Sequence, residues 1–149
     1  MVAFRNGNAY PESDCRTACM SKQVHSVSEE GFSTTNDIRD FETTIDATGE
    51  GAPDTLESLL AAYSACFVPA LRVAAEQRQA GELGRVEIDV TGDLNEDDKL
   101  AAVSFDVKVA GDLGDKTDAV VERAAELCKV HDALKTELYA DVSVEGDAF

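Results

Sequence analysis

Residues 54–81 read DTLESLLAAYSACFVPALRVAAEQRQAG, and this stretch decides the fold because it predicts one long, apolar helix. Asp54 is a favourable N-cap, and Glu57 three residues later completes a capping box. We therefore interpret Glu57 first as a capping residue. A broad apolar face then repeats at helical spacing, through Leu56, Leu59, Leu60, Tyr63, Phe67, Leu71 and Ala74.

Gly81 is a natural helix terminator, so we expect the helix to span residues 55–80. At a rise of about 1.5 Å per residue its length approaches ~40 Å, comparable to the width of a whole domain. Such a helix should run through the core or through a subunit interface. Pro69 cannot donate to the carbonyl of Ala65, which predicts a kink one turn from Cys66.

Outward from this helix, shorter segments alternate apolar and polar side chains, as half-buried strands do. The short connection within the strand pair that follows the helix favours antiparallel pairing. The order of elements predicts an α+β fold rather than a parallel, doubly wound sheet. The predicted strands are 24–27, 41–47, 86–91, 103–109 and 138–144, and the further helices are 116–130 and 133–136.

The chain of 149 residues suits one folded domain. Residues 1–19 are polar and show no sustained period, which predicts a poorly structured extension before a domain at 20–149. Cys15 and Cys19 in that extension are interpreted as incidental thiols. No stretch approaches the roughly 20 uninterrupted apolar residues of a membrane span, and no apolar export signal opens the chain. We therefore expect a cytoplasmic protein.

Acidic side chains dominate the charge, with 30 Asp and Glu against 13 Lys and Arg and a net charge of −17. Such a chain should repel nucleic acid and anionic membranes, since both bind through Lys and Arg. The acids are dispersed along the sequence. This distribution favours a protein adapted to a very salty cytoplasm, where salt screens self-repulsion. An acidic protein from an ordinary cell is the alternative.

Two of the four cysteines, Cys66 and Cys128, each fall on the apolar face of a predicted helix. In the second helix, Cys128 shares a stripe with Val120, Ala124 and Leu127. Thiols in the reducing cytosol serve as buried packing, metal ligands or redox groups. Both helices should pack on one sheet, so the two thiols could meet.

The local sequences around both cysteines resemble motifs of the OsmC/Ohr family. The run LLAAYSACF at 59–67 is similar to that family's central helix, written E-L-L-x-A-A-x-x-A-C, which ends on a peroxide-reacting cysteine. The run AELCKVH at 125–131 is similar to its second motif, of the C-P-V-H type. Their order and spacing also match, and the resemblance extends over residues 20–144.

The resemblance implies an OsmC-like fold, with a mostly antiparallel sheet packed on a long central helix in an intertwined dimer. It implies that Cys66 attacks an organic hydroperoxide and that Cys128 resolves the product to a disulfide, which an external lipoyl or thioredoxin-like dithiol reduces. No other cofactor and no metal are expected. The family's arginine from the N-terminal strands is carried over to Arg39, its glutamate to Glu57, and His131 could assist as an acid or polarise Cys128.

This sequence departs from the family pattern at two places. Lys129 stands where a proline often follows the second cysteine. The Ohr branch opens its long helix with N-P-E, whereas Asp54-Thr55-Leu56 stands here, so the acid falls one position later at Glu57. Two alternatives stay open: an OsmC-like protein that binds a small apolar ligand without turnover, and a metal site at Cys66, Cys128 and His131.

Overall fold

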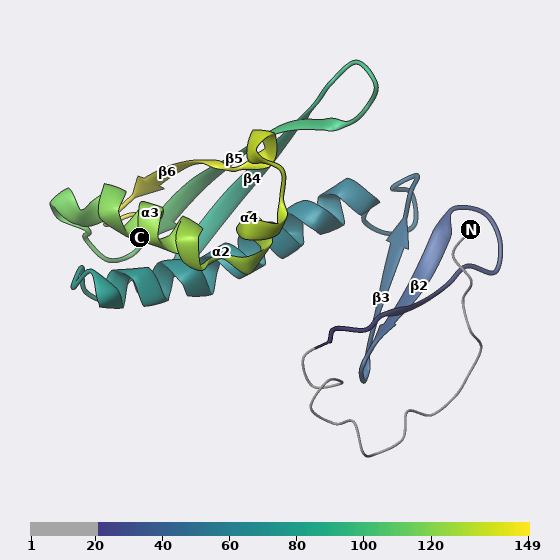
Figure 1. The fold of residues 1–149 in the computed structure, drawn as a ribbon, viewed down its shortest axis with the longest axis horizontal. Helices are drawn as coiled ribbons and strands as arrows, with labels where there is room; N and C mark the ends of the chain where they lie inside the picture. The colour runs from purple at the N-terminus through teal and green to yellow at the C-terminus, as the bar shows by residue number, and fades with distance from the viewer. Residues whose placement is uncertain (1–20) are drawn as a thin grey trace. The chain divides into compact units, whose positions relative to one another are not determined.

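The computed structural model describes residues 21–149 and divides the chain into two compact units, Met1–Ala52 and Pro53–Phe149. The expectations for residues 1–19, including those for Cys15 and Cys19, lie outside the described residues. The mixed content of strands and one long helix is the predicted α+β class (Figure 1).

The described part of the first unit is an antiparallel meander of three strands, ordered β1-β2-β3. Its strands are β1 (His25–Val27), β2 (Ser33–Ile38) and β3 (Phe41–Asp46). The prediction for 41–47 is confirmed within one residue, whereas β2 was not predicted. Its sequence STTNDI is polar throughout, so it carries no apolar alternation to reveal a strand.

The second unit begins with α2 (Thr55–Gln77), and its capping box is confirmed. Asp54 Oδ1 accepts from the Glu57 N–H at 2.8 Å, and Glu57 Oε2 accepts from the Asp54 N–H at 2.8 Å. The helix continues through Pro69.

The predicted end of α2 at residue 80 is wrong by three residues. Gln79 takes a left-handed conformation with φ of 55°. The Ala80 N–H reaches back to the Ala75 carbonyl at 2.8 Å, and the Gln79 N–H reaches the Glu76 carbonyl at 3.0 Å. These two bonds form a Schellman ending, with glutamine in the position that glycine usually takes.

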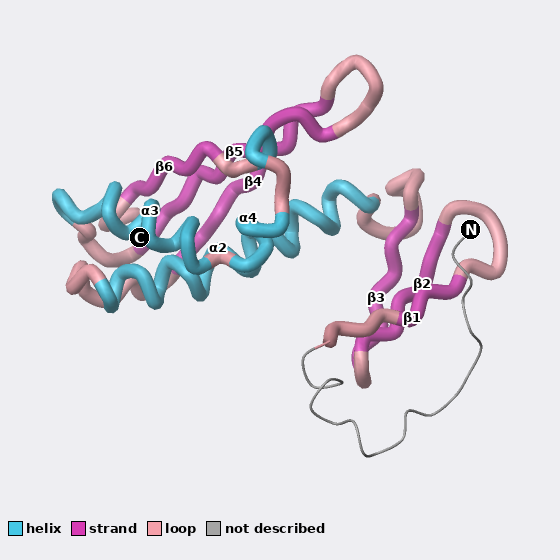
Figure 2. The backbone as a smooth tube through the Cα atoms, viewed as in Figure 1, coloured by secondary structure: helices cyan, strands magenta, loops and turns pink. Residues whose placement is uncertain are grey.

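A three-stranded sheet ordered β4-β5-β6 forms the other layer of this unit (Figure 2). Its strands are β4 (Val86–Leu94), β5 (Leu100–Val109) and β6 (Asp141–Glu145). β4 and β5 pair antiparallel, which confirms the prediction, and β6 pairs parallel to β5. Alternate residues of β5 are buried, so one face of the sheet is covered.

The predicted helix at 116–130 is two helices rather than one. The 3-10 turn η2 (Gly114–Lys116) leads into α3 (Thr117–Leu127). Cys128 is extended, with φ of −73° and ψ of 111°, and the short helix α4 (Lys129–Ala133) starts after it. The piece expected at 133–136 is the 3-10 turn η3 (Thr136–Leu138). The break changes the direction of the chain at the second cysteine.

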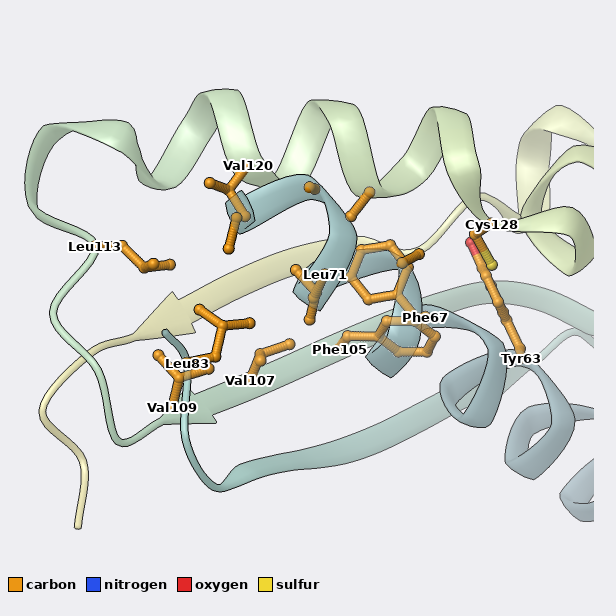
Figure 3. Packing of buried hydrophobic residues seen from close by; sticks show 14 of the residues in the cluster. Tyr63, Phe67, Leu71, Leu83, Phe105, Val107, Val109, Leu113, Val120 and Cys128 are labelled. Atoms are coloured by element: carbon orange, nitrogen blue, oxygen red, sulfur yellow. The ribbon is translucent and has the colours of Figure 1, made fainter. Parts of the chain in front are cut away.

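The core of the second unit lies between the sheet and the helices. Its buried side chains come from α2, β5 and α3, and Figure 3 shows Tyr63 and Cys128 together at one end of the cluster. Phe67 and Phe105 meet edge to face, with ring centroids 5.3 Å apart. By length and composition alone α2 could cross a membrane. Its buried residues instead belong to this core.

Candidate active site

Cys66 lies in the middle of α2, on the edge of its buried face. Tyr63, Phe67 and Ala70 beside it are buried, whereas Cys66 itself is half-buried. Residues three and four apart share one helix face, so this placement follows from the spacing read in the sequence. The thiol therefore borders the apolar core and remains open to a small reactant.

Cys128 sits at the break between α3 and α4 and is fully buried. Its N–H ends α3 by donating to the Ala124 carbonyl at 2.9 Å. Its Sγ accepts from the His131 N–H at 3.4 Å and so caps α4. The stripe of Val120, Ala124 and Cys128 is buried as predicted, but Cys128 is a junction residue and not part of a continuous helix.

The structure brings the two thiols together, and both are free rather than joined in a disulfide. Each thiol lies close enough to the other to shift its pKa. Burial works to raise the pKa of Cys66. Hydrogen bonds from the backbone N–H groups of Val130 and Lys129, the neighbouring side chain of Cys128 and the positive charge of Lys129 outweigh it, so the Cys66 pKa falls below the ordinary thiol value.

The pKa of Cys128 moves in the opposite direction. Burial raises it first, and the neighbouring side chain of Cys66 and its negative charge raise it further, although the backbone N–H of His131 counteracts them. Of the pair, Cys66 therefore loses its proton more readily than Cys128. This asymmetry suits one nucleophile and one resolving thiol.

Next to Cys128, the rings of Tyr63, His131 and Tyr139 contact one another. Tyr63 Oη lies 2.6 Å from His131 Nδ1, and the Ala140 N–H donates to the same oxygen at 2.9 Å. The His131 ring stacks on Tyr139 with centroids 3.9 Å apart. His131 was expected to act on Cys128 through its side chain. It contacts Cys128 through its backbone N–H, while its imidazole binds Tyr63.

The two other predicted site residues have different surroundings. Glu57 is engaged in the capping box of α2, as its first interpretation expected. Arg39 belongs to the first unit, in the turn between β2 and β3, with φ of 57° and its guanidinium 5.2 Å from the centre of the Phe41 ring. The action of Arg39 and Glu57 on Cys66 stays a prediction.

Sequence reasoning missed three groups of this site: Lys129, the backbone of Val130, and Tyr63. It sought the groups that activate Cys66 on the same helix and among the arginines. The two that lower the Cys66 pKa, Lys129 and the backbone of Val130, come instead from α4, which follows the second cysteine directly. The lysine that replaces the family's usual proline was the available signal, because it adds both a cation and an N–H that proline lacks.

The predicted alternative of a metal site finds no support in the second unit. Within residues 21–149, no group of three or more His, Cys, Asp or Glu side chains is arranged to hold a metal ion. His131 Nδ1 is also occupied by Tyr63. The residues that meet are two thiols, a tyrosine and a histidine.

Comparisons with known proteins show what this chain is similar to. A family model described as OsmC-like protein matches residues 34–143. An uncharacterized protein of Haloferax volcanii is 47% identical over 128 residues, which cover 85% of this chain and 97% of that protein.

Solved structures share the fold at low identity. The OsmC-like protein of Mycoplasma pneumoniae matches with a TM-score of 0.72 at 19% identity, over 85% of this chain and 96% of that one. The organic hydroperoxide resistance protein OhrB of Bacillus subtilis matches with a TM-score of 0.64 at 22% identity, over 85% of this chain and 99% of that one.

Proposed function

Because this chain belongs to the OsmC-like protein family, we propose that it is a thiol-dependent peroxidase that reduces organic hydroperoxides through Cys66 and Cys128. The observation that carries the proposal is that two free thiols from α2 and from the start of α4 meet, with the Cys66 pKa lowered and the Cys128 pKa raised. Only the thiolate attacks a peroxide, so the lowered pKa assigns that step to Cys66.

In the first step the Cys66 thiolate attacks the terminal oxygen of the hydroperoxide. A sulfur–oxygen bond forms and the oxygen–oxygen bond breaks. The alkoxide that leaves takes up a proton and becomes an alcohol, and Cys66 becomes a sulfenic acid. The apolar surroundings of Cys66 at the edge of the core favour an apolar substituent on the peroxide.

In the second step Cys128 attacks the sulfur of the sulfenic acid. The sulfur–sulfur bond forms, the sulfur–oxygen bond breaks, and hydroxide leaves with the Cys128 proton as water. An external dithiol of the lipoyl or thioredoxin type then restores both thiols by exchange and is itself oxidised to a disulfide. The cycle requires no metal and no bound cofactor.

We propose that the other predicted site residues, Arg39, Glu57 and His131, have the roles that the family resemblance implies. The resemblance gives Arg39 the role of a cation for Cys66 and gives Glu57 the role of the acid that holds it, while Glu57 also caps α2. Lys129 already contributes a positive charge to Cys66 within the second unit. His131 acts next to Cys128.

We propose that the protein works as a homodimer in the cytoplasm, where dithiol reductants are available. The support is an exposed face of small apolar residues on α2, at Ala61, Ala62 and Ala65, which a second copy would cover. The acidic chain argues against nucleic acid and anionic membranes as partners. The solution mass of the protein tests the dimer, and a monomer at cellular salt would refute it.

One experiment tests the reaction directly. The reduced protein is treated with one equivalent of cumene hydroperoxide, and its intact mass is measured. We expect the loss of two hydrogen atoms in the wild type, a trapped sulfenic acid in Cys128→Ser and no change in Cys66→Ser. Equal background rates of peroxide consumption by wild type and Cys66→Ser, with dihydrolipoamide as reductant, would instead indicate a ligand-binding protein.

A further inference from the structure

The hydroxyl of Tyr63 makes two hydrogen bonds inside the second unit. The residue is 1% exposed. Its oxygen lies 2.6 Å from His131 Nδ1 and 2.9 Å from the backbone nitrogen of Ala140. Its ring meets Phe105 edge to face at 4.7 Å. The group is thus held on three sides, one helical turn before Cys66.

The direction of these hydrogen bonds follows from the hydrogens available. The Ala140 N–H can only donate, so the Tyr63 oxygen accepts that bond. The single hydroxyl hydrogen of Tyr63 is then free to go to His131 Nδ1, which must be unprotonated. Burial lowers the pKa of His131 and thereby favours this neutral ring, although the charge of Asp132 opposes it.

The same histidine also touches the resolving thiol. Its backbone N–H donates to Cys128 Sγ at 3.4 Å, and its ring stacks on Tyr139. Tyr63 on α2 therefore binds the segment 128–140 through two hydrogen bonds, one to His131 and one to Ala140. This segment carries Cys128, and α2 carries Cys66.

We propose that Tyr63 and His131 are positioning residues that hold Cys128 against α2, so that the resolving thiol meets the oxidised Cys66. This inference rests on the proposed peroxidase function and deepens it. Neither side chain needs to touch the peroxide. Fixing two reacting groups in place raises their effective concentration, and a loosened segment loses that advantage.

The consequence is a selective effect on the two chemical steps. Removing the Tyr63 hydroxyl leaves the Cys66 thiolate and its reaction with peroxide intact. Disulfide closure slows, because the Cys128 segment is no longer anchored. The sulfenic acid then persists and becomes open to further oxidation to sulfinic acid.

The test uses Tyr63→Phe, which retains the ring and its packing. Rapid-quench mass spectrometry follows the sulfenic acid, trapped with dimedone, and the disulfide after one equivalent of cumene hydroperoxide. We expect unchanged formation of sulfenic acid and closure slowed about tenfold, the effect of one buried hydrogen bond. Tyr139→Phe is the matched control, since its hydroxyl makes no hydrogen bond among the described residues.

A second pair of variants guards against misfolding. His131→Asn keeps an oxygen near the position of Nδ1 and should close at nearly the wild-type rate, whereas His131→Ala should close slowly. If Tyr63→Phe closes as fast as the wild type, the positioning role is wrong while the peroxidase remains. If the wild type itself forms no disulfide, the proposed function fails instead. Slowing of both steps together would indicate a general structural defect and would also overturn the inference.

Discussion

The thiols of Cys66 and Cys128 lie far apart in the chain, yet they meet in the fold, and their pKa values are shifted in opposite directions. One thiol is half-buried on α2 and the other is fully buried at the start of α4. This relationship gives two residues of the same type different acidities. The difference can be tested without a substrate.

Alkylation should distinguish the two thiols. We expect Cys66 to react with iodoacetamide before Cys128, because its pKa is lowered and it is less buried. The pH midpoint of its reaction should fall below that of an ordinary thiol. Peptide mapping after short labelling at several pH values measures both effects. Labelling of Cys128 first, in the native protein, would reverse the assigned roles.

Lys129 should contribute to the reactivity of Cys66. Lys129→Met removes the positive charge but keeps the backbone N–H, so we expect a fall of about two- to fivefold in the rate of Cys66 with peroxide at neutral pH. The difference should shrink at high salt. Lys135→Met, an exposed lysine further along the same segment, is the control. Equal rates for the two variants would remove Lys129 from the site.

The lowered pKa of His131 should make the free energy of unfolding fall as the pH falls. Because burial lowers that pKa, the unfolded chain binds a proton at a pH where the folded chain does not. This contribution is complete above the ordinary histidine pKa and is lost as pH falls from there toward the folded value. His131→Asn cannot titrate. Urea unfolding of both proteins across this window should show the wild type losing more stability on acidification.

Phe105 should be a large contributor to the core. Its ring is fully buried and meets both Tyr63 and Phe67 edge to face. Phe105→Ala should lower the free energy of unfolding by about 3–5 kcal/mol, through lost burial and the cavity left behind. Phe149→Ala, at a residue 55% exposed, should cost much less. Similar urea midpoints for these two variants would contradict the described core.

Salt should stabilise this protein. A net charge of −17 repels itself, and the screening length falls from about 10 Å at 0.1 M to about 3 Å at 1 M salt. We expect Tm to rise steadily with KCl. Tetramethylammonium chloride should have a similar effect if screening is the cause. A Tm that is flat over this range would favour an ordinary acidic protein.

Local signals were sufficient for the start of α2 and for the antiparallel pair β4 and β5. A capping box involves only residues three apart, and strand alternation shows directly in the chain. The end of α2 was placed too late, because Gln79 rather than Gly81 adopts the left-handed turn. The polar strand β2 was missed, since its pairing with β1 and β3 stabilises it rather than its own apolar pattern.

The sequence alone determined the α+β class, the long helix and the two cysteines worth attention, because periodicity and short motifs are properties of neighbours along the chain. Only the tertiary structure decided what activates Cys66. Helix α3 ends before Cys128, and α4 begins after it and packs on α2. Lys129 and Val130 therefore lower the Cys66 pKa, and the His131 ring contacts Tyr63. A pKa depends on burial, charges and donors in space, and these come from segments that the chain order keeps apart.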